Sequence, residues 1–317
     1  MPREAEPAGP GLRIDGRLPA IVVAAALLLL AAAGVAYAVV WGTSTTPSAS
    51  QPGGAGVAAT DTSRADTAQV PEVLWSADME DGSLRAWYAP ETSAVGDFGG
   101  GEFTSGGGET SASDEQAHSG AWSAKLTLAT ELGGARLFRW REFRAERDLT
   151  QRVWMFIPEA YRLTGDASDG RYWNITQLKS RTENLDRNDP IWFVNLTNED
   201  GELIPQLVWW PRTLEGPHRD QSGFRRYTNE GARVPVGKWF ELTTRVRQSN
   251  EFDGLVEVSV NGEKIFSVDD VRTAYRSCTY DDWCTDQHWS VNNYSDGLSP
   301  APAEIFVDDA VIERATG

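Results

Sequence analysis

Apolar and polar residues alternate along most of the chain beyond residue 71, and this alternation limits the possible folds more than any other feature. In 239–247, for example, Phe240, Leu242, Thr244 and Val246 occupy every second position. Neighbouring side chains of a strand point to opposite faces, so such a segment buries one face and leaves the other free. No long stretch has a helical period. The pattern predicts strands at 121–129, 135–144, 151–157, 172–179, 191–197, 203–210, 239–247, 255–260, 288–294 and 304–312.

So many strands in one domain predict a two-sheet antiparallel β-sandwich of the jelly-roll type. Asn261-Gly262, between two alternating runs, is the strongest hairpin signal in the chain. The second face of 239–247 is polar and carries Trp239 and Arg245, which favours a curved sandwich whose concave side meets a ligand. No repeat of 20–50 residues is visible, which argues against a propeller or a solenoid.

The N-terminal part contains an apolar segment, residues 18–41, without a charged residue. A helix needs ~20 such residues to cross a bilayer. The basic residues before it, Arg3, Arg13 and Arg17, predict that residues 1–17 are cytoplasmic and that 18–41 is a signal-anchor helix. Ala36-Tyr37-Ala38 also fits a cleavage site, and cleavage after Ala38 would give a secreted protein. The length of the apolar run favours the anchor.

Residues 42–70 are mostly small or polar and include no aromatic residue, so we predict a disordered linker. Residues 71–317 suit a single domain. The chain is therefore expected to be a monomeric, single-pass cell-membrane protein with its C-terminal domain outside the cell. The formal net charge of −17 argues against nucleic acid or anionic lipid as a partner.

The chain has two cysteines, Cys278 and Cys284. In an extracellular domain such a closely spaced pair is expected to form a disulfide, and two free thiols are the alternative. Two soft ligands are too few for a zinc site.

Short motifs follow one another through the C-terminal domain: Trp75-Ser-Ala-Asp-Met-Glu80, His118-Ser-Gly-Ala-Trp-Ser-Ala-Lys-Leu126, Val153-Trp-Met-Phe-Ile-Pro-Glu-Ala-Tyr161, Gly237-Lys-Trp-Phe-Glu-Leu242, Val258-Ser-Val-Asn-Gly262 and Ile305-Phe-Val-Asp-Asp309. Together they resemble the jelly-roll polysaccharide lyases of the heparin lyase I-like and alginate lyase-like group, in the concanavalin A-like superfamily. These motifs mostly specify the fold. Non-catalytic carbohydrate-binding modules share several of them, so a lectin-like surface domain is the alternative function.

Alginate lyase-like families carry three motifs on the concave sheet, R-x-E-L-R, Q-I-H and Y-F-K-x-G-x-Y. Partial matches occur in that order at Glu142-Phe-Arg144, Gln177-Leu-Lys179 and His288-Trp-Ser-Val-Asn-Asn-Tyr294. The first motif has Trp140 in place of its leading arginine, and the second has Lys179 in place of its histidine. In the third motif, Tyr294 matches the final tyrosine. His288 stands in place of the first tyrosine, Ser290 in place of the lysine and Asn292 in place of the glycine.

The resemblance implies β-elimination on a uronic acid-containing polysaccharide, without a catalytic cofactor. Arg144 and Gln177 would neutralise the uronate carboxylate, Tyr294 would serve as base and acid in turn, and Lys179 or His288 would assist as base. Strand period places Gln177 and Lys179 on one face, and it places His288, Ser290, Asn292 and Tyr294 on one face of another strand. The candidate substrate-binding residues are Arg139, Arg141, Trp209, Arg245 and Asn292.

The arginines between residues 136 and 147 are candidates for an anionic-sugar site. The alternative is that they form a face exposed to solvent. One residue of the Trp209-Trp210 pair is expected to belong to the core.

Related sandwich modules bind a structural Ca²⁺, which implies a site formed by Glu80 with Asp308 or Asp309. The alternative is that these acids solvate strand ends. A retaining glycoside hydrolase is disfavoured, because no strand has the E-x-D-x-x-E run that would place its carboxylates on one face. A lyase acting on an acidic polysaccharide is therefore the favoured function, ahead of the lectin-like domain.

Overall fold

The computed structural model describes residues 71–88, 99–140, 147–159, 161–164, 171–181, 188–210, 224–274 and 288–315. The predicted segments 1–17, 18–41 and 42–70 lie outside these ranges, and so do Arg141, Arg144, Cys278 and Cys284. The predictions made for them therefore remain predictions. No helix within the described ranges is long and apolar enough to cross a membrane.

The described residues form an all-β domain, as the alternation predicts, with one short 3₁₀ helix, η2 (Arg85–Trp87). Its strands are β1 (Val73–Ala77), β2 (Gly99–Ser113), β3 (Ser123–Trp140), β4 (Asp148–Phe156), β5 (Arg162–Leu163), β6 (Trp173–Arg181), β7 (Asn188–Glu199), β8 (Glu202–Trp210), β9 (Arg225–Thr228), β10 (Trp239–Arg247), β11 (Gly254–Val260), β12 (Glu263–Val271), β13 (His288–Asp296), β14 (Leu298–Ser299) and β15 (Ala303–Arg314).

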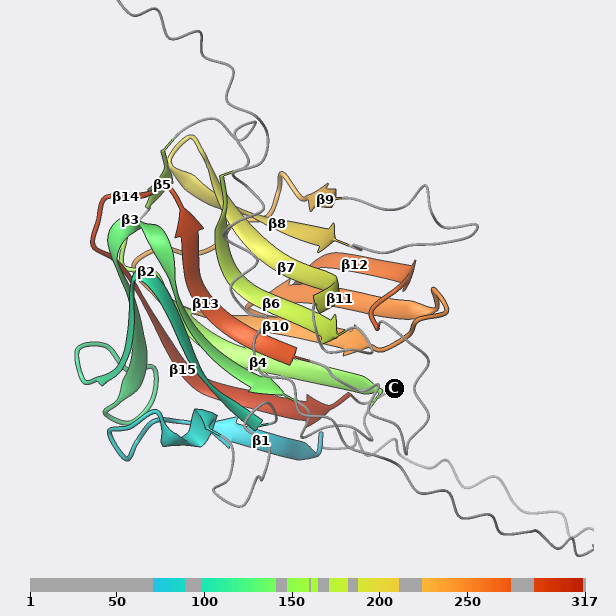
Figure 1. The fold of residues 1–317 in the computed structure, drawn as a ribbon, viewed down its shortest axis with the longest axis horizontal. Helices are drawn as coiled ribbons and strands as arrows, with labels where there is room; N and C mark the ends of the chain where they lie inside the picture. Colours follow the sequence, from blue (N-terminus) through green and yellow to red (C-terminus); the bar gives the residue numbers. More distant parts are fainter. Residues whose placement is uncertain are drawn as a thin grey trace, which may run out of the picture. The chain divides into compact units, whose positions relative to one another are not determined.

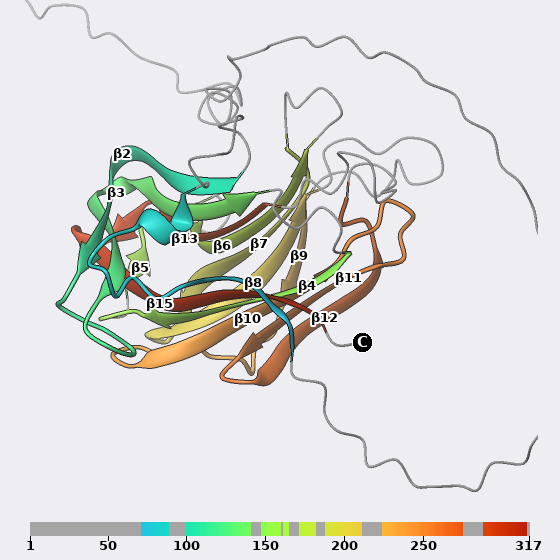
Figure 2. The same cartoon turned by 90° about the horizontal axis from the view of Figure 1, so that it is seen from below.

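Thirteen strands join one antiparallel sheet in the order β12-β11-β10-β4-β15-β3-β13-β6-β7-β8-β9, with β1 added to β15 and β2 to β3. The sheet folds over on itself at β3. Residues 124–128 of this strand pair with β15, whereas residues 132–140 pair with β13. The fold thus has two layers, which Figures 1 and 2 show from two sides. We call them the β10 layer (β1, β15, β4, β10, β11 and β12) and the β13 layer (β13, β6, β7, β8 and β9, with the later half of β3).

The core lies between the two layers and follows the alternation. Strands β4 and β10 are buried at every second residue. Phe240, Leu242 and Val246 are all buried, and Thr244 donates a hydrogen bond of 2.9 Å to the buried Gln151. Burial of each large apolar side chain contributes ~1.5–3 kcal/mol. Four tryptophans of the core are fully buried, namely Trp87, Trp173, Trp192 and Trp209.

The strand prediction needs correction in several places, and β1, β5, β9, β12 and β14 are not among the ten predicted ranges. The expected strands 121–129 and 135–144 are one continuous strand, β3, as far as Trp140, because Gly133 and Gly134 continue the pairing with β13 rather than forming a turn. The glycine-rich β2 was not predicted. It pairs with almost the whole of β3, so long-range pairing overrides a poor local strand propensity.

The hairpin prediction is confirmed. Asn261 and Gly262 connect β11 to β12 with φ angles of 52° and 78°, the left-handed pair that a tight hairpin turn requires. Asn261 also connects this turn to β10, the neighbour of β11 in the sheet, because its side-chain oxygen accepts a 2.9 Å hydrogen bond from the amide of Glu241.

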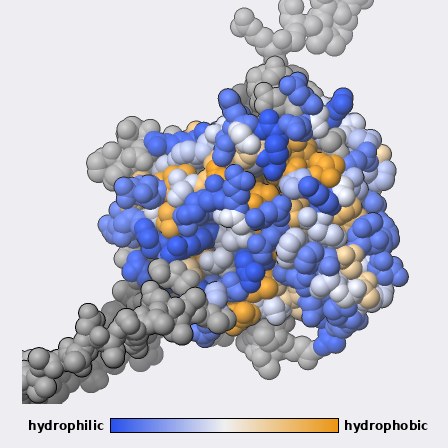
Figure 3. All heavy atoms as spheres, turned by 180° about the vertical axis from the view of Figure 1, so that it is seen from behind, coloured by the Kyte–Doolittle hydropathy of each residue, from blue (hydrophilic) through white to orange (hydrophobic). Residues whose placement is uncertain are grey.

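Ion pairs cover the outer face of the β10 layer. Arg245 pairs with Asp148 at 2.9 Å, and Arg152 pairs with Glu241 at 3.2 Å and with Glu313 at 2.6 Å. Figure 3 looks at the molecule from the side of this layer and shows a mainly hydrophilic surface with hydrophobic patches. The polar face of β10 is therefore a solvated face, where charged side chains neutralise one another.

Candidate functional site

A second polar face, on the β13 layer, points away from the core. Along β13, Trp289 and Val291 join the core, so His288, Ser290, Asn292 and Tyr294 have the opposite orientation. Residues directly opposite each other in an antiparallel pair share a face. His288 lies opposite Lys179, and Ser290 lies opposite Gln177. The structure thus brings together the partial second and third motifs. We call this surface the site face.

Buried polar atoms concentrate on the site face. Gln177 is 8% exposed, and Ser290 and Asn292 are fully buried. The side-chain oxygens of all three, and Nε of Arg136, have no hydrogen-bond partner among the described residues. Each such group costs about 1–3 kcal/mol when it stays unpaired. Four of them on adjacent strands indicate a surface arranged to bind a polar ligand.

A ladder of amide side chains crosses three strands beneath these atoms. The Nδ2 of Asn292 donates to Oδ1 of Asn174 at 2.6 Å, and the Nδ2 of Asn174 donates to Oδ1 of Asn195 at 3.1 Å. Asn174 also donates to the carbonyl oxygen of Val194 on β7. This ladder fixes the orientation of Asn292 and leaves its own side-chain oxygen without a hydrogen-bond partner among the described residues. Asn292 was predicted to bind substrate, and it lies on the site face.

Arg136 brings a positive charge to this face, because it lies opposite Asn292 in the pairing of β3 with β13. Its guanidinium carbon lies 5.2 Å from the ring centre of Tyr294 and 5.3 Å from that of Phe103. Burial lowers the pKa of Arg136 to about 10, against the opposing influence of Tyr294 and Tyr172. The guanidinium is therefore charged at neutral pH.

Tyr294 and Tyr172 form a pair beside Arg136. Their ring centres are 5.5 Å apart and the ring planes are tilted by 31°. Gly134 lies directly opposite Tyr294, and a Cβ atom there would be 2.0 Å from Cδ2 of the tyrosine ring. A glycine at this position therefore makes room for the ring.

Lys179 and His288 lie toward the other end of the site face. His288 is buried, and its ring centre is 5.3 Å from that of Phe138, which belongs to the same face of β3. Trp210, at the far edge on β8, stacks on Phe224 with 4.6 Å between ring centres. Trp210 is opposite Ile191, which in turn is opposite Lys179, so this aromatic pair belongs to the same face.

Three predicted substrate-binding residues do not line the site face. Arg139 points to its reverse side, is 3% exposed, and donates hydrogen bonds to the carbonyl oxygens of Trp87 and Tyr88 at 3.1 and 2.7 Å. Trp209 belongs to the core, where it stacks on Trp192 at 5.3 Å. Arg245 lies on the outer face of the other layer.

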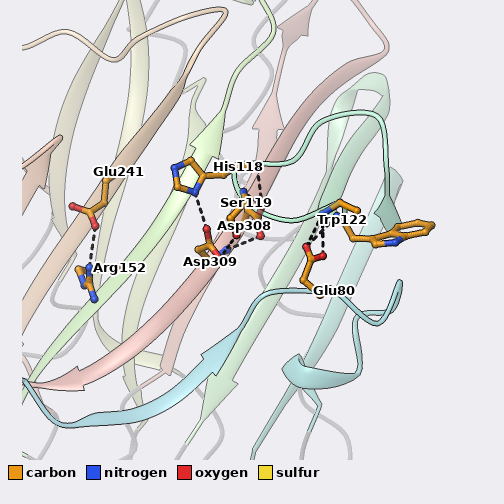
Figure 4. Close-up of polar contacts among 9 residues, drawn as sticks. Glu80, His118, Ser119, Trp122, Arg152, Glu241, Asp308 and Asp309 are labelled. Atoms are coloured by element: carbon orange, nitrogen blue, oxygen red, sulfur yellow. Dashed lines mark hydrogen bonds and ion pairs between the residues drawn. The ribbon is translucent and has the colours of Figure 1, made fainter.

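The three carboxylates predicted to bind calcium accept hydrogen bonds from the turn 118–122 (Figure 4). Glu80 accepts from the amides of Ala121 and Trp122 at 2.9 and 3.1 Å. Asp308 accepts from the amide of His118 at 2.8 Å, and Oδ2 of Asp309 lies 2.7 Å from the His118 imidazole.

The prediction of a Ca²⁺ site formed by Glu80 with Asp308 or Asp309 stays a prediction. The part of the chain that the structure describes holds no group of three or more His, Cys, Asp or Glu side chains placed to bind a metal.

No protein-family model matches the chain, and no curated protein matches it. Among solved structures, the fold is similar to an endo-β-1,4-glucuronan lyase from the fungus Trichoderma reesei, with 14% identity and a TM-score of 0.47 over 77% of this chain and 96% of that chain. It is also similar to an alginate lyase from Aplysia kurodai, with 11% identity and a TM-score of 0.46 over 77% and 99%. A carbohydrate esterase from the Shiga toxin-encoding bacteriophage phi24B has 13% identity and a TM-score of 0.42 over 78% and 100%.

Polysaccharide lyases are thus among the structural neighbours of this two-layer domain. These likenesses carry no conclusion about its chemistry, which has to be argued from its own side chains.

Proposed function

We propose that the chain is a polysaccharide lyase that cleaves a uronic acid-containing polysaccharide by β-elimination on the site face. The observation that supports this function is the juxtaposition of a buried guanidinium, Arg136, with the ring of Tyr294, which in turn packs against the ring of Tyr172. Buried amide and hydroxyl oxygens lie beside them on adjacent strands. A cation, a proton carrier and polar ligand-binding groups are what elimination from a uronate requires.

The cation and amides serve the carboxylate of the sugar. The proton on C5 becomes acidic enough to remove only when the negative charge that develops on the neighbouring carboxylate is stabilised. Arg136 and the side-chain amide of Gln177 would supply that stabilisation. Arg136 was not among the site residues predicted from the partial motifs, and Arg144 stays a candidate from the sequence alone.

Tyr294 would carry the proton. As a phenolate it takes the proton from C5, the electrons of that C–H bond form the C4–C5 double bond, and the bond from C4 to O4 breaks. Tyr294, now a phenol, returns the proton to O4 and becomes a phenolate again, so the enzyme ends unchanged. Both transfers need the phenolic oxygen within ~3 Å of the atoms concerned. Lys179 and His288, on the same face, would assist as bases further along the polymer.

The second candidate function is a lectin-like domain that binds an acidic polysaccharide without cleaving it. The partly buried Trp210, stacked on the 64% exposed Phe224, favours this function because such a ring suits stacking on a sugar. The amide ladder also suits sugar hydroxyls. Both functions use the same face, so only a reaction product separates them.

We further propose, on the sequence, that residues 18–41 anchor a monomeric chain in the cell membrane with residues 71–317 outside. In that compartment Cys278 and Cys284 would form a disulfide, which mass spectrometry of the non-reduced protein would detect as a loss of two hydrogens. A structural Ca²⁺ near Glu80 also remains a proposal.

The full-length chain, incubated with a panel of uronate polymers, tests the lyase. We expect ultraviolet absorbance near ~232 nm from the new double bond. The variant Tyr294→Phe should lose turnover by roughly 10²-fold or more while keeping its fold. The matched control is Tyr161→Phe, because the hydroxyl of Tyr161 accepts a 2.9 Å hydrogen bond from the backbone of Glu304, away from the site face. A wild-type chain that binds a polymer but forms no unsaturated product would establish the lectin-like function instead.

A further inference from the structure

We propose that Trp210, Phe224 and Arg226 form a second sugar-binding subsite, at the β9 edge of the site face, which holds the acidic polysaccharide several sugars away from Tyr294. We call these three residues the distal subsite. This inference deepens the proposed function and rests on it for the chemical class of the polymer. It requires binding and no cleavage.

A row of directly opposite residues connects β13 with β9 across the site face. The row consists of Ser290, Gln177, Phe193, Val208 and Arg226. Directly opposite residues share a face, so Arg226 points to the same side of the sheet as Ser290. Phe224 reaches this face as well, because its ring stacks on Trp210.

The row is long enough to separate two contacts with one polymer. Four strand spacings of ~4.8 Å lie between β13 and β9, which gives about 19 Å along the sheet. A sugar unit of a 4-linked chain is about as long as one strand spacing, so the row corresponds to about four sugars. A dimer of sugars can therefore contact only one end of the row, whereas a hexamer can contact both ends.

The aromatic part of the distal subsite is both exposed and held in place. Phe224 is 64% exposed, more than any other large apolar residue that the structure describes. Its ring stacks on Trp210 with 4.6 Å between ring centres, and it meets Phe193 edge-on at 6.3 Å. A ring that is already packed on two neighbours loses little further freedom when a ligand binds. Its exposed surface suits the apolar C–H face of a sugar ring.

The charges of this face favour an acidic polymer. Three rows of directly opposite residues cross it, and none of their members is Asp or Glu, although the chain has 46 such residues and a net charge of −17. The rows are His288-Lys179-Ile191-Trp210, Ser290-Gln177-Phe193-Val208-Arg226 and Asn174-Asn195-Gln206-Thr228.

Arg226 adds an exposed positive charge at the far end of the middle row. A face without carboxylates and with a cation at its edge attracts an anionic chain. A uronate that stacks on Phe224 would bring its carboxylate toward the guanidinium of Arg226, two residues further along the chain, where a charge-assisted hydrogen bond can form.

The affinity for oligomers of two lengths tests the inference in the full-length chain. Tyr294→Phe is the background, because it blocks the proposed cleavage while calorimetry measures the Kd of 4-linked glucuronate and mannuronate dimers and hexamers. We expect a hexamer to bind more tightly than its dimer. Adding Phe224→Ala should reduce this advantage about tenfold, since a stacking ring is lost. Phe224 is exposed, so its variant keeps the fold.

Two control variants have matched properties on the other layer. Val73 on β1 is a 55% exposed apolar residue, and Val73→Ala should leave the ratio of hexamer to dimer affinity unchanged. Arg226→Ala should reduce this ratio most at low salt, because exposed charges are screened as the salt concentration rises. Its control is Lys238→Ala, which removes an exposed cation next to β10 and should leave the ratio unchanged.

The ratio separates this inference from the function on which it rests. A ratio that Phe224→Ala leaves unchanged would overturn the distal subsite even in an active lyase, and so would a background that binds neither hexamer. A wild type that forms no unsaturated product, together with a ratio that depends on Phe224, would overturn the lyase alone and support the subsite.

Discussion

Ser290 on β13 lies directly opposite Gln177 on β6, and each keeps a buried side-chain oxygen with no hydrogen-bond partner in the described structure. A fold gains nothing from two such atoms side by side. Leaving these oxygens unpaired lowers the stability of the fold, and a ligand that donates hydrogen bonds to them would offset this loss. This relationship makes the site face testable by stability as well as by activity.

Ser290→Ala should therefore leave the free energy of unfolding unchanged or raise it by up to about 1 kcal/mol, because it removes an unpaired hydroxyl. Binding of the polymer should weaken in the same variant. Chemical denaturation and affinity for a uronate polymer measure the two effects.

The matched control is Asn293→Ala, next to the site face on the same strand. Asn293 points to the core, donates to the carbonyl oxygens of Leu126 and Ala303, and accepts from the indole of Trp173. Its loss should cost about 2–4 kcal/mol, since it leaves three buried groups unpaired. A larger loss of stability in Ser290→Ala than in Asn293→Ala would contradict the assignment of the face.

Arg136→Ala should reduce turnover by about 10² or more, because the buried guanidinium stabilises the developing charge. Arg245→Ala is the comparison, since Arg245 is bonded to Asp148 on the other layer. It should keep full activity and lose no more than about 1 kcal/mol of stability. Steady-state kinetics on both proteins decide the matter, and equal activities would remove Arg136 from the site.

The ion pairs of the β10 layer predict a loss of stability in acid. Burial opposes ionisation of Glu257, but its hydrogen bonds to Lys264 and Ser267 and the charges of Lys264 and Arg245 outweigh this and hold the pKa of Glu257 below its ordinary value of 4.5. A carboxyl with a lowered folded pKa stabilises the fold above its unfolded pKa, and this contribution disappears as the pH falls through the folded value. Glu257→Gln should thus be about 0.5 kcal/mol less stable than wild type at neutral pH. The difference should vanish in urea titrations at the acid end, and a constant difference would refute the linkage.

Glu80 is expected to stabilise the turn 118–122 even when no metal is bound. In the presence of a chelator, Glu80→Ala should lower stability by about 1 kcal/mol, because the amides of Ala121 and Trp122 lose a charged acceptor. The same thermal scans with added Ca²⁺ examine the calcium prediction. A rise in the Tm of the wild type that is absent in Glu80→Ala would support a bound ion.

The fold could largely be predicted because each strand carries its own alternation, and Asn261-Gly262 carries its own turn geometry. The site was predicted less completely, because its composition depends on pairings between distant strands. Alternation shows that Arg136 and Arg139 point to opposite faces, but only the pairing of Arg136 with Asn292 shows which of the two lies on the site face. Tyr172 precedes β6 and has no motif around it. Its place beside Tyr294 depends on hydrogen bonds that its carbonyl oxygen accepts from the hydroxyl of Ser295 and the amide of Asp296.

The continuity of β3 limits how a polymer can reach these residues. One end of this strand is bonded into the β10 layer and the other end carries Arg136 in the β13 layer, so the two layers share a seam of unbroken backbone. The two layers cannot separate along this edge without breaking the pairing of β3 with β15 or with β13. A polysaccharide that binds the site face, as proposed, would therefore lie on the side of the β13 layer that points away from the core and not between the two layers.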